Sequence, residues 1–212
     1  MKLTIVYDNE TARAGLEADW GFSCLLESND WRLLFDTGAN GSLLLRNLEK
    51  LNLDPHHIPA VFISHGHWDH VGGLLDILSL NPGGVVYLPS SCYQPHYVGH
   101  PVWIRGSCAL TEKVFSTGEL NGVEQSLVVE TADGLLVICG CSHPGVRTIL
   151  ESAACFGRVS ALVGGLHGFK EFDLLADLKL ICPCHCTQYK SEIFQRYPKT
   201  AVRGGVGKVL EI

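Results

Sequence analysis

The hydrophobic positions of the first half of the chain follow two different periods. Short runs rich in β-forming residues predict strands at 3–7, 22–27, 31–35, 60–63 and 85–88. Leucines spaced three and four residues apart predict helices at 42–51 and 72–80. Residues 89–110 contain Pro, Gly, Ser and aromatic side chains without either period, and they predict a long loop.

The second half begins with a hairpin and then alternates between strands and helices. Residues 125–130 and 135–139 form the predicted hairpin around an Asp-Gly turn. Helices are then expected at 146–154, 172–178 and 191–196, and strands at 159–163, 180–182 and 208–212. Hairpins followed by strand–helix alternation indicate an α/β fold of mixed sheets covered by helices. Since no repeat or hydrophilic linker interrupts the pattern, residues 1–212 are expected to form one domain.

Composition narrows the classes of function. The chain has 212 residues, of which 46% are hydrophobic, and a formal net charge of −6. This balance excludes disorder and argues against nucleic acid or an anionic membrane as the main partner. The sequence shows no apolar run long enough to span a bilayer and no secretion signal, so a cytoplasmic protein is expected. The nine cysteines are an odd number, which favours free thiols in a reducing compartment.

Candidate chemistry gathers at the ends of the predicted strands. Six of the ten histidines lie a few residues beyond a strand, or between two that do: His65, His67, His70, His143, His167 and His185. Because loops that follow strands form a shared rim in sheet-based folds, these imidazoles are expected to converge on one ligand. Three of them and one carboxylate fall within residues 65–70, a donor set that suits zinc and also iron or manganese.

Several motifs resemble those of the metallo-β-lactamase superfamily. His65-Gly66-His67-Trp68-Asp69-His70 matches its H-x-H-x-D-H signature, and further matches stand at 35–38, 140–145 and 185. The phrases at 124–127, 164–167 and 183–187 resemble the branch that includes the dihydropterin–ribofuranosylaminobenzene phosphate synthases of methanopterin biosynthesis. The resemblance covers nearly the whole chain.

The resemblance implies a fold and a ligand set. The fold would be an αββα four-layer sandwich of two mixed β-sheets flanked by helices, with two metals held in a cleft. The first metal would be bound by His65, His67 and His143. The second would be bound by Asp69, His70 and His185. Asp36 would orient the ligand loop from behind, although an Asp-Thr-Gly turn without such a role is the other interpretation.

One position departs from the superfamily pattern. Most hydrolytic members have an aspartate that bridges the metals, whereas the matching strand end here carries His167. His167 is either a ligand, or near-ligand, or a histidine of the core or surface. With Asp69 as the one ligand carboxylate, the second cation is expected to bind less tightly, and a negatively charged substrate is favoured.

Five cysteines lie beside two of the candidate ligands, His143 and His185. They are Cys139, Cys141, Cys182, Cys184 and Cys186. Their C-x-C spacings differ from those of ordinary zinc sites, so small buried residues at strand ends are the favoured interpretation, and a separate structural zinc is the other.

Three functions are compatible with these residues. The first is a hydrolase, with one or two zinc ions or with iron or manganese, that uses a metal-bound hydroxide on an ester, thioester, phosphoester or similar bond of a small anionic molecule. Asp69 and His70 are its candidate catalytic residues, with Asp69 orienting the water. The second is a synthase-like enzyme that condenses a phosphorylated pterin-type or aromatic substrate on a surface of Trp68, Tyr93, Tyr97 and Trp103. The third is a non-catalytic metal-binding protein. An oligomer is compatible with all three.

Overall fold

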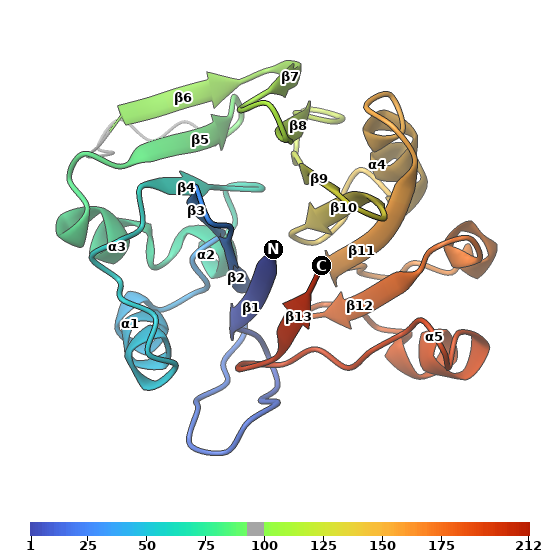
Figure 1. The fold of residues 1–212 in the computed structure, drawn as a ribbon, viewed down its shortest axis with the longest axis horizontal. Coiled ribbons are helices and arrows are strands. Elements are labelled where there is room, and N and C mark those ends of the chain that lie inside the picture. The colour runs from blue at the N-terminus through green and yellow to red at the C-terminus, as the bar shows by residue number, and fades with distance from the viewer. Residues whose placement is uncertain (93–99) are drawn as a thin grey trace.

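The computed structural model describes residues 1–92 and 100–212, which form two β-sheets packed face to face (Figure 1). The first sheet has the order β13-β1-β2-β3-β4-β5-β6. Its strands are β1 (Lys2–Tyr7), β2 (Ser23–Glu27), β3 (Arg32–Phe35), β4 (Ala60–Phe62), β5 (Val85–Pro89), β6 (His100–Ile104) and β13 (Val209–Glu211). The second sheet has the order β12-β11-β10-β9-β8-β7. Its strands are β7 (Gly106–Ala109), β8 (Val114–Gly118), β9 (Leu127–Thr131), β10 (Gly134–Cys139), β11 (Val159–Gly165) and β12 (Leu180–Cys184).

Both sheets are mixed, and helices cover their outer faces. The strand pairs β3–β4, β4–β5 and β5–β6 are parallel, as are β10–β11 and β11–β12, whereas the hairpins are antiparallel. Around the first sheet lie α1 (Gly41–Lys50), α2 (Trp68–Val71) and α3 (Leu74–Leu80). Around the second lie α4 (Val146–Ala153), the 3₁₀ helix η1 (Phe172–Leu175) and α5 (Lys190–Arg196). This arrangement confirms the predicted αββα sandwich.

Alternation along the strands divides the apolar side chains among three layers. In β3, Leu33 and Phe35 point into the layer between the sheets, while Leu34 packs with the helices α1 and α3. In β10, Ile138 faces the inner layer and Val137 joins the outer layer beneath α4. A period of two therefore fills both faces of each sheet, as expected for strands buried on both sides.

The structure corrects three predictions of secondary structure. The predicted loop at 89–110 contains the strands β6 and β7, and the strand β8 was not expected at all. The predicted helix at 172–178 is a single 3₁₀ turn, η1. The predicted helix at 72–80 is confirmed as α3, but a short helix that was not expected, α2, precedes it and carries part of the H-x-H-x-D-H motif. Strand β6 could not be recognised from the sequence, because four of its five residues are exposed. An exposed edge strand shows no alternation of apolar and polar positions.

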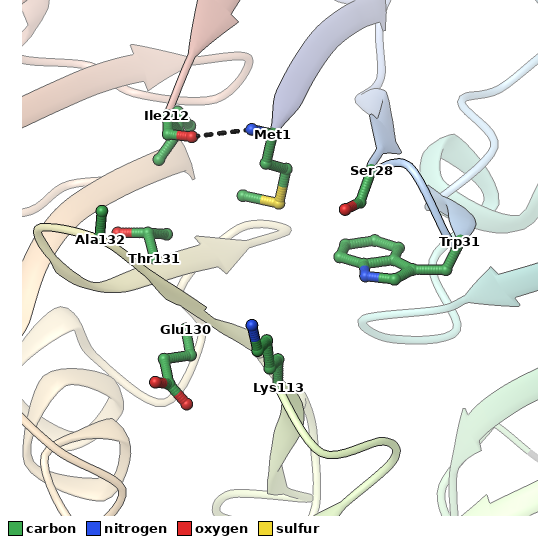
Figure 2. A pocket seen from close by; sticks show the side chains of 8 residues that line it. All are labelled: Met1, Ser28, Trp31, Lys113, Glu130, Thr131, Ala132 and Ile212. Carbon is green, nitrogen blue, oxygen red and sulfur yellow. Dashed lines mark hydrogen bonds between the residues drawn. The ribbon is translucent and has the colours of Figure 1, made fainter.

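The chain termini meet at one end of the sandwich. The amino group of Met1 donates to the carbonyl oxygen of Ile212 at 3.0 Å, beside a pocket of about 410 Å³ that also contains Trp31, Lys113 and Glu130 (Figure 2). None of the possible metal-ligand groups found among residues 1–92 and 100–212 includes a residue of this pocket. Within the same residues, no helix has the length and apolar character needed to cross a bilayer.

Candidate metal centre

The candidate residues lie at the opposite end of the sandwich, beyond the carboxyl ends of the strands. Asp36 follows β3, and the segment of His65 and His67 follows β4 and leads into α2. His143, His167 and His185 follow β10, β11 and β12 respectively. The left-handed backbone of Asp36, His167 and His185, with φ of 51°, 47° and 42°, turns each side chain at the strand end. Such conformations are uncommon for residues other than glycine, and they gather at functional sites.

His65, His67 and His143 form one triad, named here the outer triad. Their possible ligand atoms lie within 4.8 Å of one another. The ring centroid of His65 lies 4.5 Å from that of His67 and 4.8 Å from that of His143. His65 is buried and His67 is exposed, so the outer triad opens toward solvent. Burial, followed by the charges of neighbouring histidines, lowers the pKa of His65 and brings that of His143 to about 4.

Asp69, His70 and His185 form a second triad, named here the inner triad. All three side chains are buried, and their possible ligand atoms lie within 4.8 Å of one another. Oδ2 of Asp69 lies 3.3 Å from Nε2 of His185 and 3.8 Å from Nε2 of His70. Although burial opposes ionisation, the neighbouring imidazoles of His185 and His70 lower the pKa of Asp69 to about 2. The inner triad therefore contains an ionised carboxylate.

A buried hydrogen-bond network behind the ligands connects the two triads. Oδ2 of Asp36 accepts from Nδ1 of His70 and from Oγ of Ser64, each at 2.7 Å. Oγ of Ser64 lies 2.9 Å from Nδ1 of His65. With Asp36 as the acceptor, Nδ1 of His70 carries the proton and Nε2 is left with its lone pair, as a metal ligand requires. The structure thus places Asp36 where the sequence analysis expected an orienting carboxylate.

Asp8 and Asn9 hold His185 in a similar way, and the sequence analysis missed both. Oδ1 of Asn9 accepts from Nδ1 of His185 at 2.9 Å, and Oδ1 of Asp8 accepts from its backbone N–H at 2.8 Å. Nε2 of His185 is buried and has no hydrogen-bond partner among residues 1–92 and 100–212, and the same is true of Nε2 of His143. A signal was present, since a polar Asp-Asn pair directly follows the apolar strand β1.

The protein-family model described as "Metallo-beta-lactamase superfamily" matches residues 21–107. This part of the chain contributes four of the six triad residues. Over these residues the chain is similar to the metallo-β-lactamase superfamily. It is 23% identical to the 7,8-dihydropterin-6-methyl-4-(β-D-ribofuranosyl)-aminobenzene-5′-phosphate synthase of Methanocaldococcus jannaschii, over 85% of this chain and 84% of that protein. An uncharacterized protein of the same organism is 25% identical over 99% and 100% of the two chains. The first of these relatives is a synthase of the branch that the motifs of this chain resemble.

A solved structure of the superfamily agrees with this assignment. The crystal structure described as a metal-dependent hydrolase of the β-lactamase superfamily has a TM-score of 0.81 and 29% identity, and the alignment covers 100% of this chain and 99% of that one. Human tRNase Z, short form, has a TM-score of 0.65 at 16% identity over 100% and 99% of the two chains, which supports the fold alone. Superfamily members typically bind metal ions, and the groups found here are of the required chemistry.

Glu124 is a further buried residue whose role the sequence analysis did not specify. Its Oε1 accepts the backbone N–H groups of Gly140, Cys141 and Ser142 at 3.0, 3.1 and 3.1 Å. Its Oε2 accepts the N–H of His143 at 2.9 Å. Burial raises the pKa of Glu124, while these N–H groups lower it. One carboxylate therefore fixes the whole loop that carries His143.

The remaining candidates separate into core residues and residues of the site. His167 is exposed, and its ring centroid lies 4.9 Å from that of His143, so it stands beside the outer triad rather than between the two triads. Cys139, Cys182 and Cys184 are buried in the apolar layers, as small core residues are. Cys141 and Cys186 instead share possible ligand groups with the histidines.

Proposed function

We propose that the protein is a metal-dependent hydrolase that binds two metal ions, one at each triad. The observation that supports this most directly is the pair of unpartnered imidazole nitrogens, Nε2 of His143 and Nε2 of His185, one in each of two adjacent triads. A buried polar nitrogen without a hydrogen-bond partner is costly unless a ligand completes it. Zinc suits this set of imidazoles and one carboxylate best, and iron or manganese would also fit it.

The residues of the site would have different roles in the reaction. Metal ions bound here would lower the pKa of a water molecule and stabilise the negative charge that develops on the substrate. The hydrogen bond between Asp36 and His70 keeps the ring oriented and Nε2 free to ligate. Asp69, ionised and only 7% exposed, has a second carboxylate oxygen with which to accept a proton from the attacking water or to orient it.

The charge of the site favours an anionic small-molecule substrate. Asp69 is the one carboxylate of the two triads, and the other five residues are histidines. Two divalent cations would leave this arrangement with excess positive charge, which attracts a phosphate or carboxylate group. We therefore propose an ester, thioester or phosphoester of a small anion as the substrate, and no nucleic acid.

A synthase-like reaction on an aromatic substrate is the second candidate. Trp20 is 50% exposed, and its ring lies edge-on to His185 with centroids 5.1 Å apart. Trp68, next to His67, is 64% exposed. Exposed indoles beside the centre would bind a planar ring by stacking. Of the other aromatic residues that the sequence analysis proposed, Trp103 lies in β6 and is 39% exposed, whereas Tyr93 and Tyr97 lie outside the described residues.

A substrate panel would test the two candidates against each other. Protein freed of metal and reloaded with zinc, manganese or ferrous iron would be assayed on carboxylic esters, thioesters, phosphodiesters and phosphorylated aryl amines. We expect hydrolysis of at least one anionic ester, and we expect His67→Ala to abolish it. Full metal occupancy without any hydrolysis, together with turnover of an aryl-amine phosphate, would overturn the hydrolase and support the synthase.

A further inference from the structure

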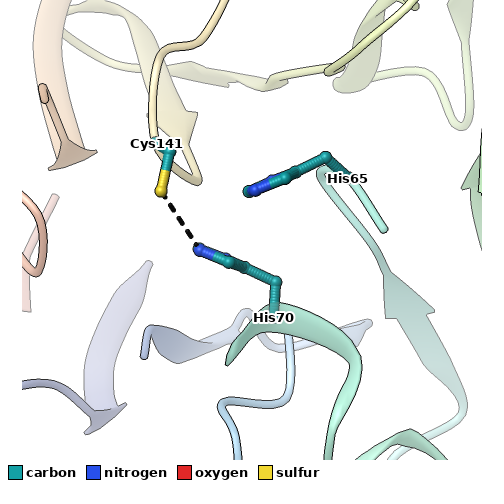
Figure 3. A group of neighbouring side chains, drawn as sticks. All are labelled: His65, His70 and Cys141. Atoms are coloured by element: carbon teal, nitrogen blue, oxygen red, sulfur yellow. Dashed lines mark hydrogen bonds between the residues drawn. The ribbon is translucent and has the colours of Figure 1, made fainter. Parts of the chain in front are cut away.

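The thiol of Cys141 lies at the centre of the ligand cluster. It belongs to three of the five possible ligand groups, whereas His167 and Cys186 each belong to one. Its partners are His65 with His70, His143 with His167, and His185 with Cys186. Sγ of Cys141 lies 3.3 Å from Nε2 of His70, and Figure 3 shows the side chains of His65, His70 and Cys141 converging from three segments of the chain. Cys141 is 3% exposed.

Hydrogen bonds of Cys141 and of the residues before and after it fix the position of this thiol. The N–H of Cys141 donates to Glu124, as do the N–H groups of Gly140 and Ser142. The left-handed Ser142, with φ of 61°, turns the loop back, and its Oγ donates to the carbonyl oxygen of Gly165 at 2.7 Å. A Cβ at position 140 would lie 2.2 Å from Oγ of Ser64, so only glycine lets the loop approach the His65 segment this closely.

The thiol also supplies what the two triads lack. Asp69 is their one carboxylate, and His167 stands beside the outer triad as an exposed imidazole. A neutral imidazole adds no negative charge, whereas a thiolate is anionic and is a preferred ligand of zinc. Cys141 shares ligand groups with both imidazoles of the inner triad, His70 and His185.

We propose that Cys141 is a metal ligand that binds through Sγ as a thiolate to the metal of the inner triad. The donor set is then two imidazoles, one carboxylate and one thiolate. The thiol proton is released to solvent when the metal–sulfur bond forms, so the charge balances without oxidation or reduction. The inference rests on the proposed metal centre. It implies that the inner position selects thiophilic metals such as zinc over manganese or magnesium.

Cobalt substitution would test this ligand in the intact protein. Thiolate bound to Co²⁺ gives an intense charge-transfer band in the near ultraviolet, which imidazole and carboxylate ligands do not give. We expect wild-type protein loaded with Co²⁺ to show this band and Cys141→Ser to lose it. Cys186→Ser is the matched control, because its thiol is the neighbouring one and shares a single ligand group with Cys141. This control is expected to keep the band.

The outcomes separate this inference from the proposed metal centre. If wild-type protein binds Co²⁺ without the band, Cys141 is not a ligand while the histidine centre stands. The same conclusion follows if Cys141→Ser keeps the band, or if only Cys186→Ser loses it. If the wild-type protein binds no Co²⁺ at all, the metal centre and the inference both fail. Since the wild-type spectrum is informative by itself, the test does not depend on the folding of a variant.

Discussion

The two triads lie side by side, with the rings of His65 and His70 only 4.2 Å apart between centroids, yet they differ in support and in charge. Both imidazoles of the inner triad hydrogen-bond through Nδ1 to a side chain behind them, Asp36 or Asn9. In the outer triad, His65 alone has such a support within the part of the chain that the structure describes, and Ser64 provides it. The other hydrogen bond of the outer triad is between two of its own members, since Nδ1 of His67 lies 3.0 Å from Nε2 of His65.

This difference indicates which metal should bind more tightly. Ligands that are already oriented lose less entropy on binding, and an ionised carboxylate adds attraction that imidazoles lack. The inner triad has both advantages, whereas the outer triad must rotate His67 away from His65. We therefore expect tight binding at the inner triad and exchangeable binding at the outer one. The sequence analysis, from the missing bridging carboxylate, favoured the opposite order.

Removing Asp36 should have the largest effect, because this side chain supports both triads. Asp36→Ala leaves the buried donors of Ser64 and His70 without an acceptor. We expect a loss of on the order of 3–5 kcal/mol in the free energy of unfolding of the metal-free protein, measured by urea denaturation. Asp36→Asn is the control of matched shape, and we expect it to fold while binding both metals more weakly. Unchanged metal affinity in Asp36→Asn would show that Asp36 is only a turn residue.

Removing His67 should abolish activity with little effect on the fold. The side chain is exposed, so His67→Ala should change the free energy of unfolding of the metal-free protein by less than about 0.5 kcal/mol. Metal analysis after dialysis should show the inner metal retained and the outer one lost. A variant that keeps two metals would remove His67 from the outer triad.

Removing the support of His185 should weaken the inner metal alone. Asn9→Ala loses the acceptor for Nδ1 of His185, and we expect the affinity of the inner metal to fall by about 10–100-fold. Competition with a chelator would measure this change, and Asn29→Ala, at an exposed asparagine outside the two triads, is the control. Equal loss at both triads would contradict separate supports.

Removing His167 should have the smallest effect. His167→Ala should leave both metals bound and should lower turnover more than stability, because the exposed ring lies beside the outer triad without belonging to it. His167→Asp is expected to tighten the outer metal and to change substrate preference, since it adds a carboxylate near His143. Steady-state kinetics with metal analysis would check both variants, and unchanged turnover in His167→Ala would make it an ordinary surface histidine.

The parts of the structure that sequence could predict are those with a local pattern. The short apolar runs of β4 and β10 predict these strands, and the ends of the two strands bring His65 and His143 together. Strand β6 could not be predicted in this way, because an exposed edge strand carries no alternation of burial. The roles of Asp8 and Asn9 depend on contacts with a residue 176 or 177 positions away, and no local pattern encodes such contacts.

Titration of metal-free protein with zinc, in competition with a chromophoric chelator, tests the unequal two-metal centre most directly. We predict two classes of binding site of clearly different affinity in the wild-type protein. The weak class should disappear in His67→Ala, and the tight class should disappear in His70→Ala. A single class of site, or a tight class that survives in His70→Ala and is lost in His67→Ala, would contradict the assignment of the stronger site to the inner triad.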